Sequence, residues 1–226
     1  ASDVYKRQDI NKYMKANGGI VFPNPNAPTG IFMPVSELEK LAEYNLNQAV
    51  VIVDEAYIAF GGESAVRLIE KYPNLLIVRT MSKSHSMAGL RVGYCLGNQS
   101  LIEGLNRIKN SFNSYVVDRC AMAAAAAGLA DETYYAGIAR KIMGTRERVG
   151  ESLIRMGFKV LPSAANFIFA SPPGGDARGL YEFLRLNGVL VRYFEGERVN
   201  KFIRVTIGTD EQMDEFLRIT ELFIKN

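Results

Sequence analysis

The sequence predicts an α/β fold in which a mostly parallel sheet with flanking helices is followed by a smaller α+β domain. Short apolar runs alternate with helical patterns up to about residue 98, as in chains that form parallel sheets. Beyond that point come three helical patterns, and then four short strand patterns separated by helices. Three of the early apolar runs end in polar residues, and the carboxyl ends of parallel strands are where such sheets bind ligands.

Periodicity and breaker residues place the elements of the first part. We expect the end of a helix at 9–17, strands at 19–22, 50–53, 75–78 and 92–96, and helices at 34–47 and 63–72. Ser36, with Glu39 three residues later, predicts a capping box at the start of the first full helix. Leu38, Leu41 and Ala42 then form an apolar stripe along that helix.

The second part is predicted to be richer in helix. We expect helices at 101–112, 116–129, 132–156, 176–187 and 210–224, and strands at 158–161, 166–170, 189–193 and 202–207. The third of these helices is long enough to link two domains, so we place the domain boundary inside it. Residues 9–145 then belong to a larger domain that contains the mostly parallel sheet, and residues 146–226 form a C-terminal α+β domain.

The bulk composition excludes several classes of protein. Of the 226 residues, 48% are hydrophobic, which is enough for a substantial core. A net charge of +3 argues against a nucleic-acid partner or an anionic membrane surface. Two cysteines fit a reducing cytoplasm, and a single histidine argues against a His-rich metal site, so we expect no metal. No apolar stretch reaches about 18 residues, the length needed to cross a membrane.

Lys83 stands in the most informative run of the chain. It follows the third expected strand among small hydroxyl residues and glycine, and Arg91 comes eight positions later. A lysine in this place can form a Schiff base with an aldehyde, and Ser82 and Arg91 can hold a phosphate.

Asp54 and Tyr57 directly follow the second expected strand. A carboxylate there can pair with a protonated ring nitrogen, and a phenol three residues later can donate a hydrogen bond to a ring oxygen. A lone lysine is usually a solvated surface residue, and Asp-Glu after a strand is more often a helix cap. The combination of several such motifs in order favours a site for an aldehyde cofactor that carries a phosphate.

These motifs resemble those of fold-type-I aminotransferases, which use pyridoxal 5'-phosphate (PLP), and among them most closely the histidinol-phosphate aminotransferases. The resemblance covers residues 9–226. It is carried by the runs NPNAPTG at 24–30, VDEAY at 53–57, TMSK at 80–83, GLRVG at 89–93, VRYF at 191–194 and FIRVTIGT at 202–209. It implies that residues 9–145 are part of a PLP-binding large domain.

The resemblance also implies a role for each site residue. Lys83 is the implied catalytic residue, which binds the cofactor and moves a proton. Asp54 would contact the ring nitrogen of the cofactor, and Tyr57 its ring oxygen. Ser82 and Arg91 would bind the phosphate of the cofactor. Arg192 and Arg204 would bind the anionic group of the substrate. Many relatives have Asn directly before Pro-Thr-Gly, where this chain has Ala27. Asn26, one residue earlier, is the candidate replacement contact to the ring oxygen.

The implied reaction is transamination between histidinol phosphate and 2-oxoglutarate in histidine biosynthesis, within a cytoplasmic homodimer. The partners would therefore be a small-molecule amino donor and a 2-oxo acid. A related aromatic aminotransferase and a threonine-phosphate decarboxylase remain as alternatives because they share the Lys, Asp, Tyr and Arg set. A PLP-binding sensor half of a transcriptional regulator is a further alternative from a different class.

The N-terminus suggests that the chain is a fragment. Residues 3–8 match the translation of a transposon-end adapter used in DNA library preparation, so we interpret residues 1–8 as a non-native scar. The resemblance implies about a hundred residues upstream, including a glycine-rich phosphate turn and a ring-stacking aromatic residue. We therefore expect the isolated chain to bind the cofactor poorly.

Overall fold

The computed structural model describes residues 9–225, so the interpretation of residues 1–8 lies outside the described part. The described chain divides into two compact units. The N-terminal unit consists of Asp9–Pro25 and Phe32–Gly137, and the C-terminal unit consists of Asn26–Ile31 and the chain from Ile138 onward. Both this division and the boundary expected at 145/146 fall inside the helix α5, Glu132–Arg155.

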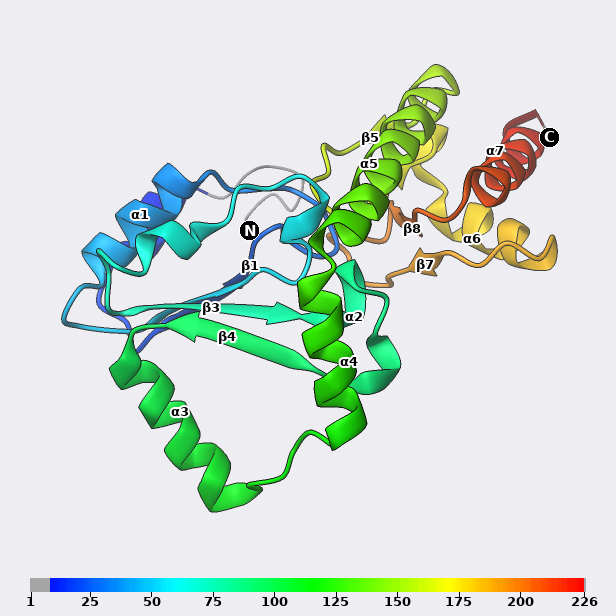
Figure 1. Ribbon diagram of the computed structural model, residues 1–226. Helices are drawn as coiled ribbons and strands as arrows, with labels where there is room; N and C mark the ends of the chain where they lie inside the picture. The colour runs from blue at the N-terminus through cyan, green and yellow to red at the C-terminus, as the bar shows by residue number, and fades with distance from the viewer. Residues whose placement is uncertain (1–8, 226) are drawn as a thin grey trace. The chain divides into compact units, whose positions relative to one another are not determined.

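The sheet of the N-terminal unit is mostly parallel, as predicted. Its strands are β1 (Ile20–Pro23), β2 (Val51–Asp54), β3 (Leu75–Thr80) and β4 (Gly93–Gly97), hydrogen-bonded in that order. The first three strands are parallel, and their register aligns Pro23, Asp54 and Val78 at the carboxyl edge. β4 returns antiparallel to β3 and pairs Thr80 with Gly93. Figure 1 shows α1 (Val35–Tyr44) above these strands and α3 (Gln99–Phe112) below them.

An apolar core joins α1 to the sheet. Leu38 and Ala42 of α1 pack with Val51 and Val53 of β2, and all four side chains are buried. This is the stripe that the helical periodicity predicts. Alternate residues of β2 face this core, so the pleat leaves Asp54 only half-buried at the strand end.

The predicted capping box is wrong. α1 begins at Val35 and its cap residue Pro34 makes no side-chain hydrogen bond, which places Ser36 inside the first turn. The Glu39 carboxylate accepts hydrogen bonds from Lys71 Nζ (2.8 Å) and Tyr72 Oη (3.0 Å) instead. The Glu39 side chain, which the local pattern assigned to a helix cap, therefore binds residues of a distant segment instead. The helices expected at 9–17 and 63–72 are reduced to 3₁₀ turns at Ile10–Tyr13 and Ala65–Leu68.

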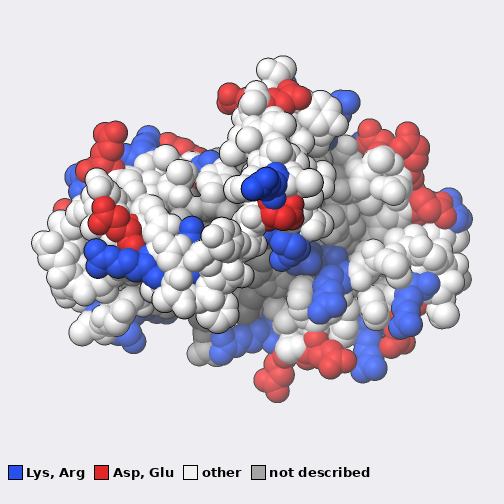
Figure 2. All heavy atoms as spheres, turned by 60° about the horizontal axis from the view of Figure 1, so that its bottom comes forward, with Lys and Arg blue, Asp and Glu red and all other residues white. Residues whose placement is uncertain are grey.

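α3 and α4 (Arg119–Ala130) are close to the helices predicted at 101–112 and 116–129, and α4 buries small residues. The single-turn helix α2 (Met81–Ser84) was not predicted. Basic and acidic side chains are interspersed on the face shown in Figure 2. Among residues 9–225 no helix is both long and apolar enough to cross a membrane, and no group of three or more His, Cys, Asp or Glu side chains could hold a metal ion.

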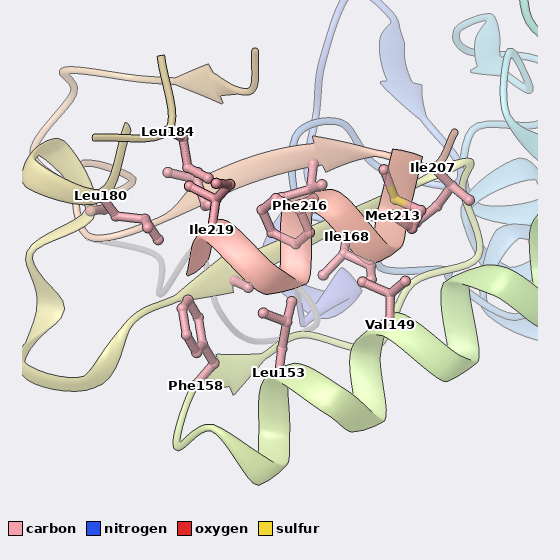
Figure 3. Close-up of a cluster of buried hydrophobic side chains, with 14 residues drawn as sticks. Val149, Leu153, Phe158, Ile168, Leu180, Leu184, Ile207, Met213, Phe216 and Ile219 are labelled. Atoms are coloured by element: carbon pink, nitrogen blue, oxygen red, sulfur yellow. The ribbon is translucent and has the colours of Figure 1, made fainter. Parts of the chain in front are cut away.

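The C-terminal unit is an antiparallel sheet with helices, in agreement with the predicted α+β class. Its strands are β5 (Lys159–Val160), β6 (Phe167–Ser171), β7 (Arg192–Tyr193) and β8 (Ile203–Thr206), in the order β5-β6-β8-β7. The helices α6 (Ala177–Leu186) and α7 (Asp210–Lys225) join the C-terminal half of α5 around a buried apolar cluster. Figure 3 shows Phe216 of α7 in the middle of this cluster, near Leu153 and Ile168.

Replacement of Phe216 by alanine is expected to lower the free energy of unfolding by about 3–5 kcal/mol, because Phe216 is fully buried and its removal leaves a cavity. Urea denaturation followed by circular dichroism would measure the loss. Leu222→Ala is the control on the same helix, since Leu222 is 43% exposed and should cost less than about 1 kcal/mol. Equal losses in the two variants would contradict the position assigned to this core.

Candidate active site

The end of β2 places the first polar groups of the predicted site. Asp54 is the last residue of the strand, and its Oδ1 accepts a hydrogen bond from the backbone N–H of Ala56 at 2.9 Å. This bond turns the chain, and Tyr57 follows as the residue that caps the 3₁₀ helix Ile58–Phe60. Phe60 of this turn is buried, whereas Asp54 and Tyr57 are half-buried.

The end of β3 delivers Lys83 to the same edge. Thr80 Oγ1 accepts from the Ser82 N–H at 3.1 Å and so caps α2, while Met81 is fully buried below the turn. Lys83 is exposed, and its Nζ lies 5.8 Å from the centre of the Tyr57 ring. Two groups that are 26 residues apart in sequence are therefore brought together by the neighbouring ends of two parallel strands.

Ser82 and Arg91 lie in one closed loop between β3 and β4. The Met81 N–H donates to the Val92 carbonyl at 3.1 Å, so both ends of the loop are held together. Arg91 has a left-handed backbone (φ 56°), and its Nη1 donates to the Ala88 carbonyl at 3.0 Å. The loop thus carries the Ser82 hydroxyl and the exposed Arg91 side chain, and their contact with a phosphate stays a prediction.

Helix α4 packs closely against the turn that carries Lys83. A Cβ added at Gly128 would lie 2.7 Å from Met87 Cε and 3.4 Å from both Met81 Cε and His85 Cδ2. The His85 ring also packs on Tyr135, with ring centres 4.4 Å apart, and burial lowers the pKa of His85. His85 is thus a packing residue of the turn, in which neutral imidazole is favoured.

Gly128→Val is expected to lower the free energy of unfolding by about 1–3 kcal/mol, because the added methyl groups would push Met81 and Met87 out of place. The same substitution at Gly104 in α3 is the control, since a Cβ there would meet no described atom within 4 Å. Thermal unfolding of both variants would measure the difference. A Gly128→Val protein as stable as Gly104→Val would contradict the tight contact.

Two arginines and a phenylalanine form a cluster in the C-terminal unit. The β7–β8 register pairs Arg192 with Arg204 across the strands. Their guanidinium carbons lie 5.6 and 5.7 Å from the centre of the Phe194 ring, and Arg204 also lies 5.1 Å from the Phe167 ring centre. The Nε of Arg204 is buried and has no hydrogen-bond acceptor within the described part of the chain. The guanidinium N–H groups of this cluster could therefore donate hydrogen bonds to an anion.

The side chain of Asn26 is engaged within its own loop. Its Nδ2 donates to Thr29 Oγ1 at 2.6 Å, and its backbone N–H donates to the Ile31 carbonyl. This loop belongs to the C-terminal unit, together with Arg192 and Arg204. The cofactor and substrate contacts assigned to these three residues stay predictions.

One charged group beside the site was not predicted from the sequence. Glu55 follows Asp54, and its carboxylate is fully buried in an ion pair with Arg79. Glu55 itself was considered only as part of an Asp-Glu pair that could cap a helix. The available signal was a second acidic residue directly after a buried apolar strand, with an arginine near the end of the next parallel strand.

The model of the family described as "aminotransferase class I and II" matches residues 6–219 of this chain. The chain belongs to that family. A histidinol-phosphate aminotransferase of Clostridium acetobutylicum is 51% identical over 209 residues, which cover 92% of this chain and 59% of that protein. The corresponding enzyme of Pseudomonas putida strain W619 is 52% identical over 89% of this chain and 58% of its own length. The chain thus spans roughly three fifths of these aminotransferases.

Solved aminotransferase structures have the same fold. The structure of histidinol-phosphate aminotransferase from Sinorhizobium meliloti, in complex with PLP, is 26% identical with a TM-score of 0.83 over 96% of this chain and 59% of that chain. That of Clostridium acetobutylicum has a TM-score of 0.86 at 27% identity and covers 96% and 67%. An L-threonine-O-3-phosphate decarboxylase from Porphyromonas gingivalis is 23% identical with a TM-score of 0.80, a likeness that shows the fold alone. The predicted α/β fold and aminotransferase class are confirmed.

Proposed function

We propose that this chain is the lysine-bearing part of a PLP-dependent aminotransferase that uses histidinol phosphate as amino donor and 2-oxoglutarate as acceptor. The observation that carries the proposal is the position of Lys83 Nζ, 5.8 Å from the Tyr57 ring centre, at the strand edge that also carries Asp54. The relatives that are about half identical to this chain are named histidinol-phosphate aminotransferases, which supports the choice of donor.

The residues at this edge fit the cofactor. When bound, PLP supplies an aldehyde and a ring that accepts electrons from the substrate carbon. The Lys83 amine would hold the cofactor covalently and then carry a proton between neighbouring atoms. The Asp54 carboxylate would keep a proton on the ring nitrogen, and the Tyr57 hydroxyl would donate to the ring oxygen.

The phosphate of the cofactor would be held by the loop between β3 and β4. Ser82 offers a hydroxyl, and Arg91 offers guanidinium donors whose orientation is set by the Ala88 carbonyl. The left-handed backbone of Arg91 fixes where its side chain leaves the loop. These groups would orient the cofactor so that its aldehyde faces Lys83.

The anionic end of the substrate would be bound by Arg192 and Arg204. The two guanidinium groups lie over the rings of Phe194 and Phe167. These contacts orient the guanidinium groups and leave their N–H groups able to donate hydrogen bonds. A phosphate can accept several such donors at once, which favours a phosphorylated donor over a neutral one. The buried Arg204 Nε supports this assignment.

The alternatives have less support. The threonine-phosphate decarboxylase matches this chain in fold at 23% identity, whereas the aminotransferases reach about half identity. An aromatic amino-acid donor would offer the two arginines only its α-carboxylate, whereas a phosphate can accept more hydrogen bonds. A sensor half of a transcriptional regulator would not need the two arginines.

We further propose a homodimer in the cytoplasm. Large apolar side chains are exposed along α3 and the segment before α4, among them Ile108 (68%), Phe112 (92%) and Tyr115 (91%). An apolar surface of this kind favours association with another protein chain. Cys95 and Cys120 are free thiols, which fits a reducing compartment. Light scattering after size-exclusion chromatography would test the dimer.

Borohydride reduction in the presence of PLP tests the cofactor proposal even if binding is weak, because each transient covalent link is fixed. Peptide mass spectrometry should show Lys83 labelled well ahead of the other lysines. Labelling of Lys83 at no more than the rate of exposed Lys109 would refute the proposal. A stable, stoichiometric chromophore in the isolated chain would instead contradict the expectation that it binds PLP poorly.

A chimera tests the substrate. This chain would be joined to the part of the Clostridium acetobutylicum enzyme that it does not match, at the aligned boundary. Turnover would be compared with histidinol phosphate, phenylalanine and threonine phosphate as donors. We expect the highest kcat/KM for histidinol phosphate, and a preference for either of the other two would assign the chain to a different substrate class.

A further inference from the structure

The carboxylate of Glu55 is fully buried and accepts hydrogen bonds from three residues. Its Oε1 accepts from the Ala65 N–H at 2.8 Å, and both carboxylate oxygens lie within 3.1 Å of Ser64 Oγ. Oε2 also accepts from Arg79 Nε at 3.0 Å and Arg79 Nη2 at 2.9 Å. Arg79 Nη2 donates in addition to Ser64 Oγ at 2.6 Å, so the network is closed.

This network joins the two segments that carry the proposed site. Glu55 comes directly after Asp54, and its backbone N–H donates to the carbonyl of Val78 on β3. Arg79 lies on β3, four residues before Lys83. The bonds to Ser64 and Ala65 close the loop 55–65, which contains Tyr57. One buried ion pair therefore connects the groups that would bind the ring to the turn that carries the amine.

The geometry makes this connection rigid. The guanidinium donates two hydrogen bonds to one carboxylate oxygen, and the carboxylate has no exposed surface. Burial lowers the pKa of Arg79, but its hydrogen bonds with Tyr94 and Glu55 outweigh burial and raise that pKa. The Arg79 guanidinium thus keeps its positive charge, and loss of this side chain would leave the fully buried Glu55 carboxylate without its counter-charge.

We infer that Glu55 and Arg79 are positioning residues, which set the placement of Asp54 and Tyr57 relative to Lys83. The inference rests on the proposed function, because those three residues are the proposed cofactor contacts. A purely structural ion pair would stabilise the fold equally well but would leave the reactivity of Lys83 unchanged. The two possibilities therefore differ in a measurable way.

The test compares Glu55→Gln and Arg79→Lys with the control Glu39→Gln. Glutamine has the shape of glutamate, but its amide nitrogen is a donor and cannot accept from Arg79. Lysine keeps the charge at position 79 and loses the two-pronged geometry, which provides a milder variant if Glu55→Gln folds poorly. Glu39 also joins distant segments, through Lys71 and Tyr72 before the start of β3, so its loss reports general destabilisation.

The first measurement needs no cofactor. Amide hydrogen exchange in Glu55→Gln and Arg79→Lys should accelerate about tenfold in both segment 55–65 and segment 80–85, and the control should not show this paired change. The second measurement is the pH dependence of borohydride labelling at Lys83. Its midpoint should move by about half a pH unit or more in both variants, because the charges around the amine are displaced.

The outcomes separate the inference from the proposed function. Faster exchange in segment 55–65 alone, or an unchanged labelling midpoint in both variants, would overturn the positioning role. If Lys83 of the unsubstituted chain shows no preferential labelling, the proposed function fails, and the exchange data still decide whether the two segments are coupled. A variant that is merely less stable, with the same labelling midpoint as the control, would show a structural role only.

Discussion

Lys83→Ala is expected to abolish covalent attachment of PLP. A positioned acid–base group by itself contributes about 10²–10⁴-fold to a rate, and we expect the loss of transamination to exceed this contribution because attachment is lost as well. Alanine has no amine, and among the predicted site residues no other side chain is a lysine. Absorbance and borohydride labelling would measure attachment, and the chimera described above would measure turnover. The fold should be unaffected, since Lys83 is exposed.

Lys109→Ala is the control for this change, because Lys109 is an exposed lysine of α3. It should retain the chromophore and the activity of the unsubstituted protein. Lys83→Ala with undiminished labelling would mean that another lysine holds the cofactor. The assignment of the strand edge as the active site would then be wrong.

Asp54→Asn is expected to lower transamination by about 10–10³-fold at neutral pH, because loss of a nearby opposite charge shifts a pKa by about 1–3 units. As the proposed partner of the cofactor's ring nitrogen, the Asp54 carboxylate would raise the pKa of that nitrogen, so its removal should lower that pKa. Above the lowered pKa the ring loses its proton, and activity should therefore recover as the pH falls. A pH–rate profile of the chimera would show this displacement.

Asparagine is the informative substitution because its side-chain oxygen can still accept the hydrogen bond from the Ala56 N–H. The turn after β2 is thus retained, and the charge alone is removed. A cofactor analogue methylated on the ring nitrogen carries a permanent positive charge and should restore part of the lost rate. A pH profile like that of the unsubstituted protein, with no rescue by the analogue, would show that Asp54 does not face the ring nitrogen.

Local sequence was sufficient to locate the helices and strands whose pattern depends only on which side chains are buried. β2 and β3 are short apolar runs, and α1 has an apolar stripe at helical spacing, so periodicity located all three. The polar residues at the ends of those strands could also be assigned to one edge of the sheet. Because parallel strands align their carboxyl ends, Asp54, Tyr57 and Lys83 follow from strand order without knowledge of distant contacts.

The hydrogen-bond partners of polar side chains could not be predicted in this way where both a local and a distant partner were available. Glu39 was assigned to a cap, and it bonds instead to Lys71 and Tyr72, which lie more than thirty residues away. The helix expected at 63–72 is a 3₁₀ turn at Ala65–Leu68, and Ser64 and the Ala65 N–H at its start donate hydrogen bonds to Glu55. The helical pattern of residues 63–72 does not show that this distant partner exists.

The sequence by itself determined the class of the sheet and the family, because apolar spacing and short motifs depend on neighbours in the chain. It also indicated which residues are proposed to hold a cofactor. Only the tertiary structure decided that β4 runs antiparallel to β3, that Phe194 lies over two guanidinium groups, and that Glu55 is buried against Arg79. Each of these depends on which distant segments meet. A charged side chain is stable in the interior only where folding places an opposite charge beside it, and the position of that partner depends on the fold of the whole chain.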